Sequence, residues 1–254
     1  MIEETAITRA IAERYMDKFL KGIKSDVCIV GGGPSGLVSA YYLARDGFSV
    51  SLFEKKLSFG GGIWGGGMMF NEVVVQRNSL EILDEIGVGY EAYDEVHYVV
   101  DAVELASGLI YAASRAGVSM FNLINVEDVM VKHGKIAGLV VNWTTVEMGG
   151  LHVDPVAVRC KAVIDATGHD AAICAIVAKK TGKLELVGEK YMWAERAEEG
   201  VVEHTSEVFP GLFVAGMSVA AVYGLPRMGP IFGGMLLSGR KVSRLVAERL
   251  RGSA

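Results

Sequence analysis

The chain has little of several features that would mark other classes of protein. It has 5 prolines and 3 cysteines in 254 residues, and Cys28, Cys160 and Cys174 are odd in number and set in apolar sequence. This favours buried, reduced thiols over disulfides. No apolar run reaches the roughly 20 residues that a membrane span requires, and the N-terminus does not resemble a signal peptide. We therefore expect a cytoplasmic protein with no membrane partner.

The chain also has no excess of positive charge. Lys and Arg number 25 against 30 Asp and Glu, so the formal net charge is −5, and no cluster of basic residues stands out. Nucleic acid is therefore not an expected partner. What the chain does have is 51% hydrophobic residues and 32 glycines. This composition predicts a compact α/β protein rich in tight turns.

The most informative stretch is a G-x-G-x-x-G run between an apolar strand at 26–30 and a helix. It reads Gly31-Gly32-Gly33-Pro34-Ser35-Gly36. Gly31 and Gly33 let the backbone approach a pyrophosphate, and Gly36 lets the helix pack closely on the strand. Ser35 adds a hydroxyl at the helix N-terminus, where backbone N–H groups and the helix dipole attract phosphate. The run predicts a dinucleotide site.

An acidic residue stands where such a site needs one. Glu54 follows the next expected strand, 48–53, and Lys55 comes directly after it. An acid at this place in dinucleotide folds accepts hydrogen bonds from the adenosine ribose. The glycine-rich loop 59–69 comes next, and we expect it to lie close to the ligand. A mobile surface loop is the alternative, against which the Ile, Trp and Met residues within it argue.

The rest of the chain alternates helices and strands without a repeat or a linker. Apolar spacing predicts helices at 3–23, 74–87, 101–116 and 233–249, a hairpin of 120–131 with 136–145, and strands at 156–164 and 211–216. The first helix could instead pack on another subunit. We expect one domain over 1–254, a Rossmann-like α/β dinucleotide-binding fold with a β-rich insertion around 118–155.

Two later segments resemble flavoproteins with a glutathione-reductase-like FAD domain. They are the strand that ends in Asp165-Ala166-Thr167-Gly168 and the strand 211–216. The resemblance implies an FAD- or NAD-binding fold of that type. In those enzymes the late strand usually ends in Gly-Asp, whereas here Met217 follows Gly216. This difference leaves room for an adenine dinucleotide other than FAD.

Three polar segments are candidates for chemistry. His152 and Asp154 precede the expected strand 156–164, and His169 follows it. Asp and His are suitable ligands for iron(II), manganese or zinc, although satisfied polar groups at strand ends are an alternative reading of the same residues. Arg227 lies in Pro226-Arg227-Met228-Gly229-Pro230. An arginine held this way suits bidentate recognition of a carboxylate, and an ordinary surface arginine is the alternative.

Together these segments resemble the thiamine thiazole synthase family, from the N-terminal helix to the helix after Met235. The resemblance implies an iron(II)-dependent enzyme that consumes NAD as a substrate and releases nicotinamide. The remaining ADP-ribose condenses with glycine, gains sulfur and closes to ADP-5-ethyl-4-methylthiazole-2-carboxylate. The glycine motif, Glu54 and Lys55 would hold the adenosine half, with Gly62 and Val126 lining the same site.

The resemblance also implies roles at the reactive end of that site. His152, Val153, Asp154 and Met217 would face the reacting part of the ligand. Asp154 and His169 match the iron ligands, and Arg227 matches the residue that binds the glycine carboxylate. His152, Asp154, His169 and Arg227 are thus the expected catalytic residues. Family members form ring-like assemblies, so the resemblance implies a homo-oligomer, an octamer.

One position departs from the eukaryotic members, which sacrifice the sulfur of a cysteine two residues before the metal-binding aspartate. That position here is His152, and an imidazole has no sulfur to give. The resemblance to archaeal-type members then implies free sulfide and repeated turnover. His152 either moves protons or only orients the ligand, since imidazole titrates near neutral pH.

The spacing of the two expected metal ligands bears on assembly. If 156–164 is one straight strand, its nine residues span roughly 30 Å at about 3.3 Å each. Asp154 and His169 of one chain then lie at opposite ends of the strand. They would share a metal across a subunit interface, which we favour, or within one chain that folds back sharply.

Three other functions stay open from the sequence. An FAD-dependent oxidoreductase predicts a yellow protein in which the glycine-rich loop has a redox role. A non-catalytic carrier of an adenylated ligand or a metal would retain its ligand without turning it over. A sugar-phosphate-forming enzyme ranks below these, because no segment resembles a dedicated bisphosphate site.

Overall fold

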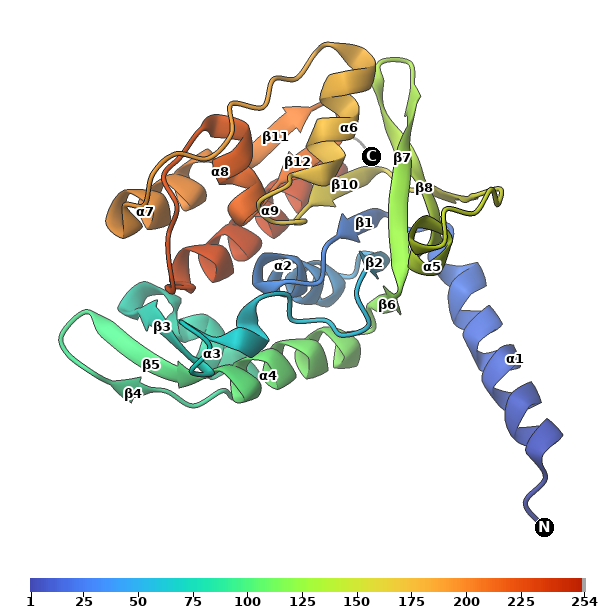
Figure 1. The fold of residues 1–254 in the computed structure, drawn as a ribbon, viewed down its shortest axis with the longest axis horizontal. Helices are drawn as coiled ribbons and strands as arrows, with labels where there is room; N and C mark the ends of the chain where they lie inside the picture. The colour runs from blue at the N-terminus through green and yellow to red at the C-terminus, as the bar shows by residue number, and fades with distance from the viewer. Residues whose placement is uncertain (253–254) are drawn as a thin grey trace.

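A computed structural model describes residues 1–252, whose centre is a six-stranded sheet (Figure 1). The strand order is β11-β12-β10-β1-β2-β6, and every neighbouring pair is parallel except β11 with β12. The strands are β1 (Val27–Val30), β2 (Val50–Glu54), β6 (Ser119–Asn122), β10 (Ala162–Asp165), β11 (Ser206–Phe209) and β12 (Leu212–Val214). This mainly parallel order agrees with the expected Rossmann-like α/β fold.

Helices cover one face of this sheet and a second sheet covers the other (Figure 1). The first layer is α2 (Pro34–Arg45), α4 (Ala102–Arg115) and α9 (Gly233–Arg251). The opposite layer is the antiparallel sheet of β7 (Ile124–Lys132), β8 (Lys135–Trp143) and β9 (Val156–Arg159), with α5 (Thr144–Met148), α6 (Ala172–Thr181), α7 (Ala194–His204) and α8 (Met217–Tyr223). Parallel strands covered on both faces read as continuous apolar runs, as 27–30 does.

Alternation along β1 divides the core in two. Val27 and Ile29 join the cluster under α2, α4 and α9, whereas Cys28 and Val30 join the cluster under the β7–β9 sheet. Cys28, Cys160 and Cys174 are all buried and free, as expected. A hydrogen bond with Cys160 and burial raise the pKa of the Cys28 thiol, and burial raises that of Cys174. These thiols are therefore poorly reactive.

A third, small antiparallel sheet corrects one prediction. It consists of β3 (Glu72–Gln76), β4 (Glu91–Ala92) and β5 (His97–Asp101). The helix expected at 74–87 was wrong in its first half, where β3 precedes a short 3-10 turn (Arg77–Ser79), and only α3 (Leu80–Ile86) is α-helical. Val73 and Val75 are buried on one face of β3 while Val74 is half-buried. β-Branched residues fit such a pleated strand.

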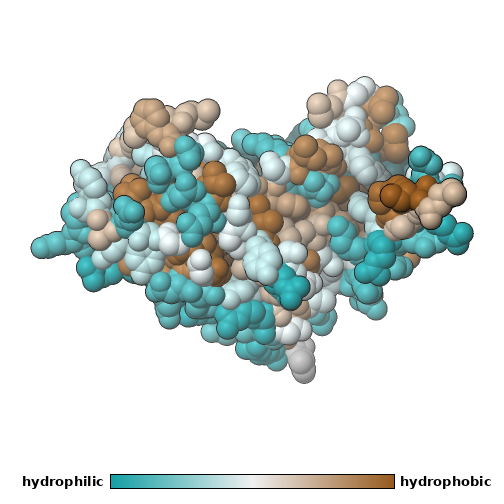
Figure 2. Space-filling model, turned by 90° about the horizontal axis from the view of Figure 1, so that it is seen from below, coloured by the Kyte–Doolittle hydropathy of each residue, from teal (hydrophilic) through white to brown (hydrophobic). Residues whose placement is uncertain are grey.

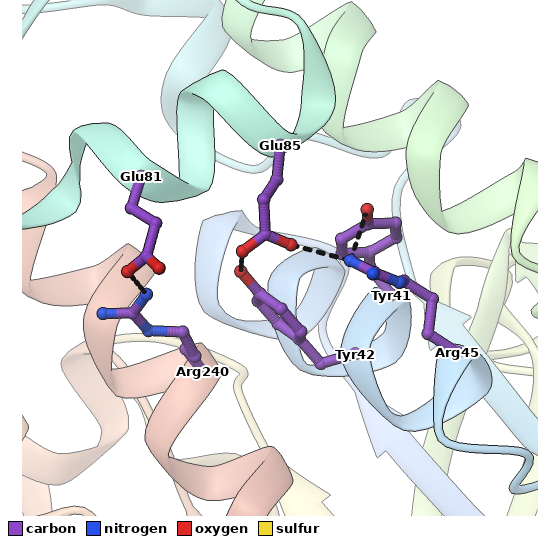
Figure 3. Close-up of polar contacts among 6 residues, drawn as sticks. All are labelled: Tyr41, Tyr42, Arg45, Glu81, Glu85 and Arg240. Carbon is purple, nitrogen blue, oxygen red and sulfur yellow. Dashed lines mark hydrogen bonds and ion pairs between the residues drawn. The ribbon is translucent and has the colours of Figure 1, made fainter.

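Ion pairs and hydrogen bonds attach α3 to the main helical layer (Figure 3). Glu85 accepts hydrogen bonds from Tyr42 at 3.0 Å and Arg45 at 2.7 Å, both on α2. Arg240 of α9 contacts Glu81 at 2.5 Å. Burial, reinforced by the bond to Glu85, raises the pKa of Tyr42 to about 12. The small sheet and its helix are thus fastened to the elements that form one wall of the cavity described below.

The expected straight strand at 156–164 was also wrong. The chain leaves β9, which pairs with β8, and enters β10, which pairs with β1 and β12. Between them Lys161 donates its backbone N–H to Asp26. In β9 only Val158 is buried, whereas every residue of β10 is buried, and the two strands belong to different sheets. A single span of roughly 30 Å therefore does not exist, and the argument that it separates Asp154 from His169 loses its basis.

The other expected elements are present with shifted ends. The N-terminal helix is α1 (Glu4–Gly22), and the hairpin is β7 with β8, which turns at His133 and Gly134. A short 3-10 turn (Ile63–Gly65) lies inside the glycine-rich loop. The separate sheet of the β-rich segment runs from Ile124 to Arg159, whereas the insertion was expected around 118–155, and β6 belongs to the central sheet. Among residues 1–252 no helix is long and apolar enough to cross a bilayer.

The N-terminal half of α1 extends away from the body of the molecule (Figure 1). Its C-terminal half packs through Tyr15 and Phe19, whose rings meet Phe121 edge-on. Along its whole length α1 also exposes large apolar side chains, namely Ile7, Ile11, Met16 and Leu20. Figure 2 shows apolar surface gathered at the end of the molecule where α1 lies. Within one chain this surface has no cover.

Candidate functional site

A cavity of about 770 Å³ opens at the carboxyl ends of β1, β2, β10 and β12. Ligands of open α/β sheets bind at this edge. Its walls come from the glycine motif, the 61–68 part of the glycine-rich loop, the segments 166–173 and 215–217, and the loop 227–235. The glycine-rich loop therefore lies at this cavity, which makes its position consistent with the expected one.

The glycine motif places backbone without side chains at the wall of the cavity. Gly31 has φ +99°, and a Cβ there would lie 2.3 Å from the Ala166 carbonyl oxygen. A Cβ on Gly33 would meet no protein atom within 4 Å, because Gly33 faces the cavity. The N-terminus of α2 has no side-chain cap. Its backbone N–H groups are thus available to an anionic ligand.

Two residues of the motif make close contacts with the rest of the protein. Gly36 does not line the cavity, and a Cβ there would lie 2.0 Å from the Gly31 carbonyl oxygen. Ser35 lines the cavity, but its hydroxyl donates to the Met235 carbonyl at 2.9 Å. Both residues therefore fasten α2, Gly36 to the turn after β1 and Ser35 to α9.

Glu54 is buried at the end of β2 and lines the cavity beside Lys55. Its carboxylate accepts the backbone N–H of Gly32 at 2.8 Å and that of Lys56 at 2.8 Å. Each carboxylate oxygen has a second lone pair for a ligand hydroxyl. Gly62, Val126 and Met217 also line the cavity, as expected.

At the other end of the cavity, His169 and Arg227 come together around a residue that the sequence did not suggest. Glu189 contacts His169 Nδ1 through Oε1 at 2.7 Å and Arg227 Nε through Oε2 at 3.7 Å. His169 and Arg227 line the cavity. Glu189 lies in an irregular segment with no periodic pattern, so no signal in the sequence could have found it. Two expected catalytic residues are thus neighbours.

The other expected residues lie elsewhere in the single chain. His152, Val153 and Asp154 are exposed in the loop between α5 and β9, and none of them lines the cavity. Figure 1 shows this loop projecting from the body beyond β8 and α5. Within residues 1–252, no three His, Cys, Asp or Glu side chains are grouped so as to hold a metal. The chain therefore presents His169 at the cavity and Asp154 outside it.

Asp165 organises the loop that carries His169. It is fully buried at the end of β10 and accepts hydrogen bonds from the backbone N–H groups of Ile173 at 3.0 Å and Cys174 at 2.9 Å, in the first turn of α6. It also accepts from Thr167 N–H at 3.0 Å, Thr167 Oγ1 at 2.7 Å and Ser218 Oγ at 3.2 Å. A carboxylate is favourable at a helix N-terminus. This role of the Asp-Ala-Thr-Gly segment was not foreseen.

A second buried carboxyl group lies at the N-terminus of α9, next to the arginine loop. Glu198 Oε2 accepts from Gln76 Nε2 and from the Gly234 backbone N–H, each at 2.5 Å. Among the described residues, Oε1 of Glu198 and Oε1 of Gln76 have no hydrogen-bond partner. Burial raises the pKa of Glu198 although both bonds oppose the shift. Protonation would add one donor to a pair that has two unpartnered acceptors.

This arrangement predicts how stability varies with pH. Because the folded-state pKa of Glu198 is raised, its contribution to stability is full below the unfolded value of 4.5 and is lost as pH rises through the folded value. Glu198→Gln, which imitates the neutral form, should flatten this dependence. Urea unfolding of both proteins, from pH values below 4.5 upward through neutral pH, measures the free energy of unfolding. The control is Glu199→Gln, which changes an exposed glutamate. A difference between wild type and Glu198→Gln that stays constant with pH would contradict the prediction.

Comparison with known proteins agrees with these observations. The family model described as "Thi4 family" matches residues 8–232. The chain belongs to the Thi4 family. It is 54% identical over 256 residues to the thiamine thiazole synthase of Methanothermobacter thermautotrophicus, covering 98% of this chain and 99% of that protein. It is 52% identical over 251 residues to the thiamine thiazole synthase of Pyrococcus horikoshii, covering 99% and 100%.

Solved structures agree with this family and with the fold. The crystal structure of Thermovibrio ammonificans THI4 matches with a TM-score of 0.96 and 48% identity, covering 98% of this chain and 99% of that one. A geranylgeranyl bacteriochlorophyll reductase-like protein from Thermoplasma acidophilum matches with a TM-score of 0.60 and 17% identity, over 91% and 79%. That second likeness concerns the fold alone. The Thi4 relatives support an enzymatic role.

Proposed function

We propose that this Thi4-family chain is a thiamine thiazole synthase that forms ADP-5-ethyl-4-methylthiazole-2-carboxylate for thiamine biosynthesis. Its substrates are NAD, glycine and free sulfide, and its metal is iron(II). The observation that carries the proposal is the single cavity that joins a dinucleotide cradle to His169 and Arg227. The 54% identity to an archaeal thiamine thiazole synthase over nearly the whole chain supports it.

The cradle supports NAD as the dinucleotide. The uncapped N-terminus of α2 binds the pyrophosphate through backbone N–H groups. Glu54 accepts hydrogen bonds from the adenosine ribose with the lone pairs that Gly32 and Lys56 leave free. Lys55, Gly62 and Val126 line this half of the cavity, and Met217 lies at the end of β12. The position after Gly216 carries no carboxylate, which disfavours FAD.

His169 and Asp154 fit iron(II), because an imidazole and a carboxylate are suitable ligands for it. His169 lines the cavity, and Asp154 stands on the exposed loop 149–155. Bound iron would supply Lewis acidity and a template for sulfide and the glycine-derived part of the intermediate. Arg227 binds the glycine carboxylate and so orients that substrate. His152 orients the ligand or moves protons beside Asp154.

The three cysteines support an external source of sulfur. Cys28, Cys160 and Cys174 are buried, and none of them lines the cavity. The raised pKa values of Cys28 and Cys174 keep them as unreactive thiols. His152 stands where a sulfur-donating cysteine would be needed. The chain therefore takes up free sulfide and turns over repeatedly.

We also propose that the chain works as a homo-oligomer, a ring-like octamer, with the iron site shared between subunits. The loop that carries Asp154 is exposed and includes the apolar Leu151 and Val153. The apolar surface of α1 has no cover within one chain. Around the cavity the chain also exposes large apolar side chains, Met68, Met69, Phe70, Tyr191, Met192 and Trp193. Such surfaces mark interfaces between proteins.

The proposed reaction can be tested directly. Pure protein incubated without oxygen with NAD, glycine, sulfide and iron(II) should release nicotinamide and form the adenylated thiazole in excess of one equivalent per subunit. Mass spectrometry measures both products. Omitting each substrate in turn, or replacing Arg227 by Ala, should prevent the thiazole from forming. NAD binding should survive the Arg227→Ala change, because the adenosine half lies at the other end of the cavity.

Two results would favour the other candidate functions. Flavin in the purified protein, with no thiazole formed, would indicate an FAD-dependent oxidoreductase. A tightly bound adenylated ligand that is retained while fresh NAD is not consumed would indicate a carrier. Either result would overturn the proposed catalytic reaction.

A further inference from the structure

The contacts of Glu189 point to a role that depends on the proposed function. Its side chain is 15% exposed, whereas those of His169 and Arg227 are 57% and 58% exposed. The carboxylate therefore lies behind the two cavity residues and touches both, His169 at 2.7 Å and Arg227 at 3.7 Å. One fixed anion thus links the expected iron ligand with the expected glycine-binding residue.

The backbone around Glu189 is held on both sides. Gly188 donates its N–H to the Ala221 carbonyl at 2.9 Å, and Lys190 donates to Leu225 at 3.0 Å. Further along, Arg227 N–H donates to Tyr191 at 3.0 Å, and Trp193 N–H donates to Arg227 at 3.1 Å. The segment 187–193 therefore lies along residues 221–227, which are the end of α8 and the loop after it. Glu189 and Arg227 are consequently placed by the same hydrogen-bonded pair of segments.

The contact with His169 decides which ring nitrogen is free. A neutral imidazole carries one N–H, and a carboxylate at Nδ1 favours the proton there, as the hydrogen-bond donor. Nε2 then keeps its lone pair for a metal. Carboxylates that hold metal-binding histidines in this way fix the ring and raise its basicity. The ion pair with Arg227 is made through Nε at 3.7 Å.

We propose that Glu189 is a positioning residue that holds His169 in the Nδ1–H form and holds the Arg227 side chain at the cavity. This proposal rests on the proposed function for the identity of the metal and of the carboxylate substrate. The arrangement of the three side chains does not depend on that identity. Glu189 itself does not line the cavity, so it acts through its two neighbours, which do.

The first test concerns the tautomer and needs no turnover. Long-range proton–nitrogen NMR of the metal-free full chain, labelled at its 5 histidines, distinguishes the two neutral forms at about pH 8, above the usual histidine pKa. His169→Gln identifies the signals of His169. Wild type should show the Nδ1–H form, and Glu189→Ala should shift His169 toward the Nε2–H form. An Nε2–H form in wild type, or no change in Glu189→Ala, would overturn the proposal.

The second test concerns the ligands. Calorimetry without oxygen should show iron(II) affinity about 10- to 100-fold weaker in Glu189→Ala, the usual effect of losing such a carboxylate. The KM for glycine should rise while the KM for NAD stays within about twofold. Glu189→Gln, whose amide oxygen still accepts from Nδ1–H, should lose less metal affinity than Glu189→Ala. The control is Glu185→Ala, an exposed glutamate upstream of the 187–193 segment.

The outcomes separate this proposal from the proposed function. Wild type that makes no thiazole would overturn the proposed function, and the tautomer would still test the role of Glu189. Wild type that makes thiazole, with unchanged iron affinity and glycine KM in Glu189→Ala, would overturn the role of Glu189 alone. An equal rise in the KM values for glycine and NAD would also count against it, since that result indicates general damage to the cavity.

Discussion

Asp154→Ala and His169→Ala subunits, each inactive alone, should regain activity when they assemble into one oligomer. His169 lines the cavity of its own chain, whereas Asp154 lies on an exposed loop outside that cavity. If the partner subunit supplies the aspartate, a mixed oligomer contains sites in which both ligands are intact. Random mixing in equal amounts makes about a quarter of the sites complete, because each ligand is intact in half of the subunits.

The measurement is thiazole formation by oligomers that carry both subunits, purified through two different tags after co-expression. Each variant alone should form less than about one hundredth of the wild-type product, because iron then has one protein ligand instead of two. The double variant purified in the same way is the control. Verified mixed oligomers without recovered activity would place both ligands in one chain and contradict the shared site.

Asp165→Ala should lower the free energy of unfolding more than any other substitution named for this chain. The buried carboxylate accepts from Ile173 N–H, Cys174 N–H, Thr167 and Ser218. An unsatisfied buried donor costs about 1 to 3 kcal/mol, and at least two backbone donors lose their acceptor. We expect the free energy of unfolding to fall by about 3 to 5 kcal/mol, out of the roughly 5 to 15 kcal/mol typical of a protein.

Urea unfolding measures this loss, and Asp17→Ala is the matched control. Asp17 is an exposed aspartate of α1 whose ion pair with Arg14 is at 3.8 Å, and such surface pairs contribute about 1 kcal/mol or less. The stability of Asp165→Asn should lie between those of wild type and Asp165→Ala, because its one amide oxygen still accepts hydrogen bonds whereas its amide nitrogen does not. A loss below about 1 kcal/mol in Asp165→Ala would show that other groups satisfy the first turn of α6.

Much of the cavity around the glycine motif could be predicted from the sequence. The roles of Gly31, Gly33, Gly36 and Glu54 depend on local backbone geometry and on residues close to one another along the chain. A strand, a tight turn and a helix in succession can adopt one productive arrangement. The sequence pattern therefore predicted the fold class, the edge of the sheet at which the cavity lies, and the close packing of the helix on the strand at Gly36.

The sequence-based prediction of secondary structure was wrong where pairing with distant segments decided the outcome. The run 156–164 has apolar residues in both halves, although β9 buries only Val158 and β10 is buried throughout. A mostly apolar run does not tell one strand from two strands in different sheets. The expected helix 74–87 included Val74 and Val75, which instead pair with β5 as part of β3. The β-branched valines favour a strand, and the helix prediction gave that preference too little weight.

The sequence by itself determined the parallel-sheet fold, the glycine motif with Glu54 after the next strand, and the presence of His152, Asp154, His169 and Arg227 as candidate catalytic residues. Only the tertiary structure decided which of them meet. Glu189 reaches His169 and Arg227 because the segment 187–193 lies along 221–227, and Asp165 binds the first turn of α6 because the chain reverses after β10. Local patterns specify what a short segment can form, whereas contacts between distant segments depend on how the whole core packs.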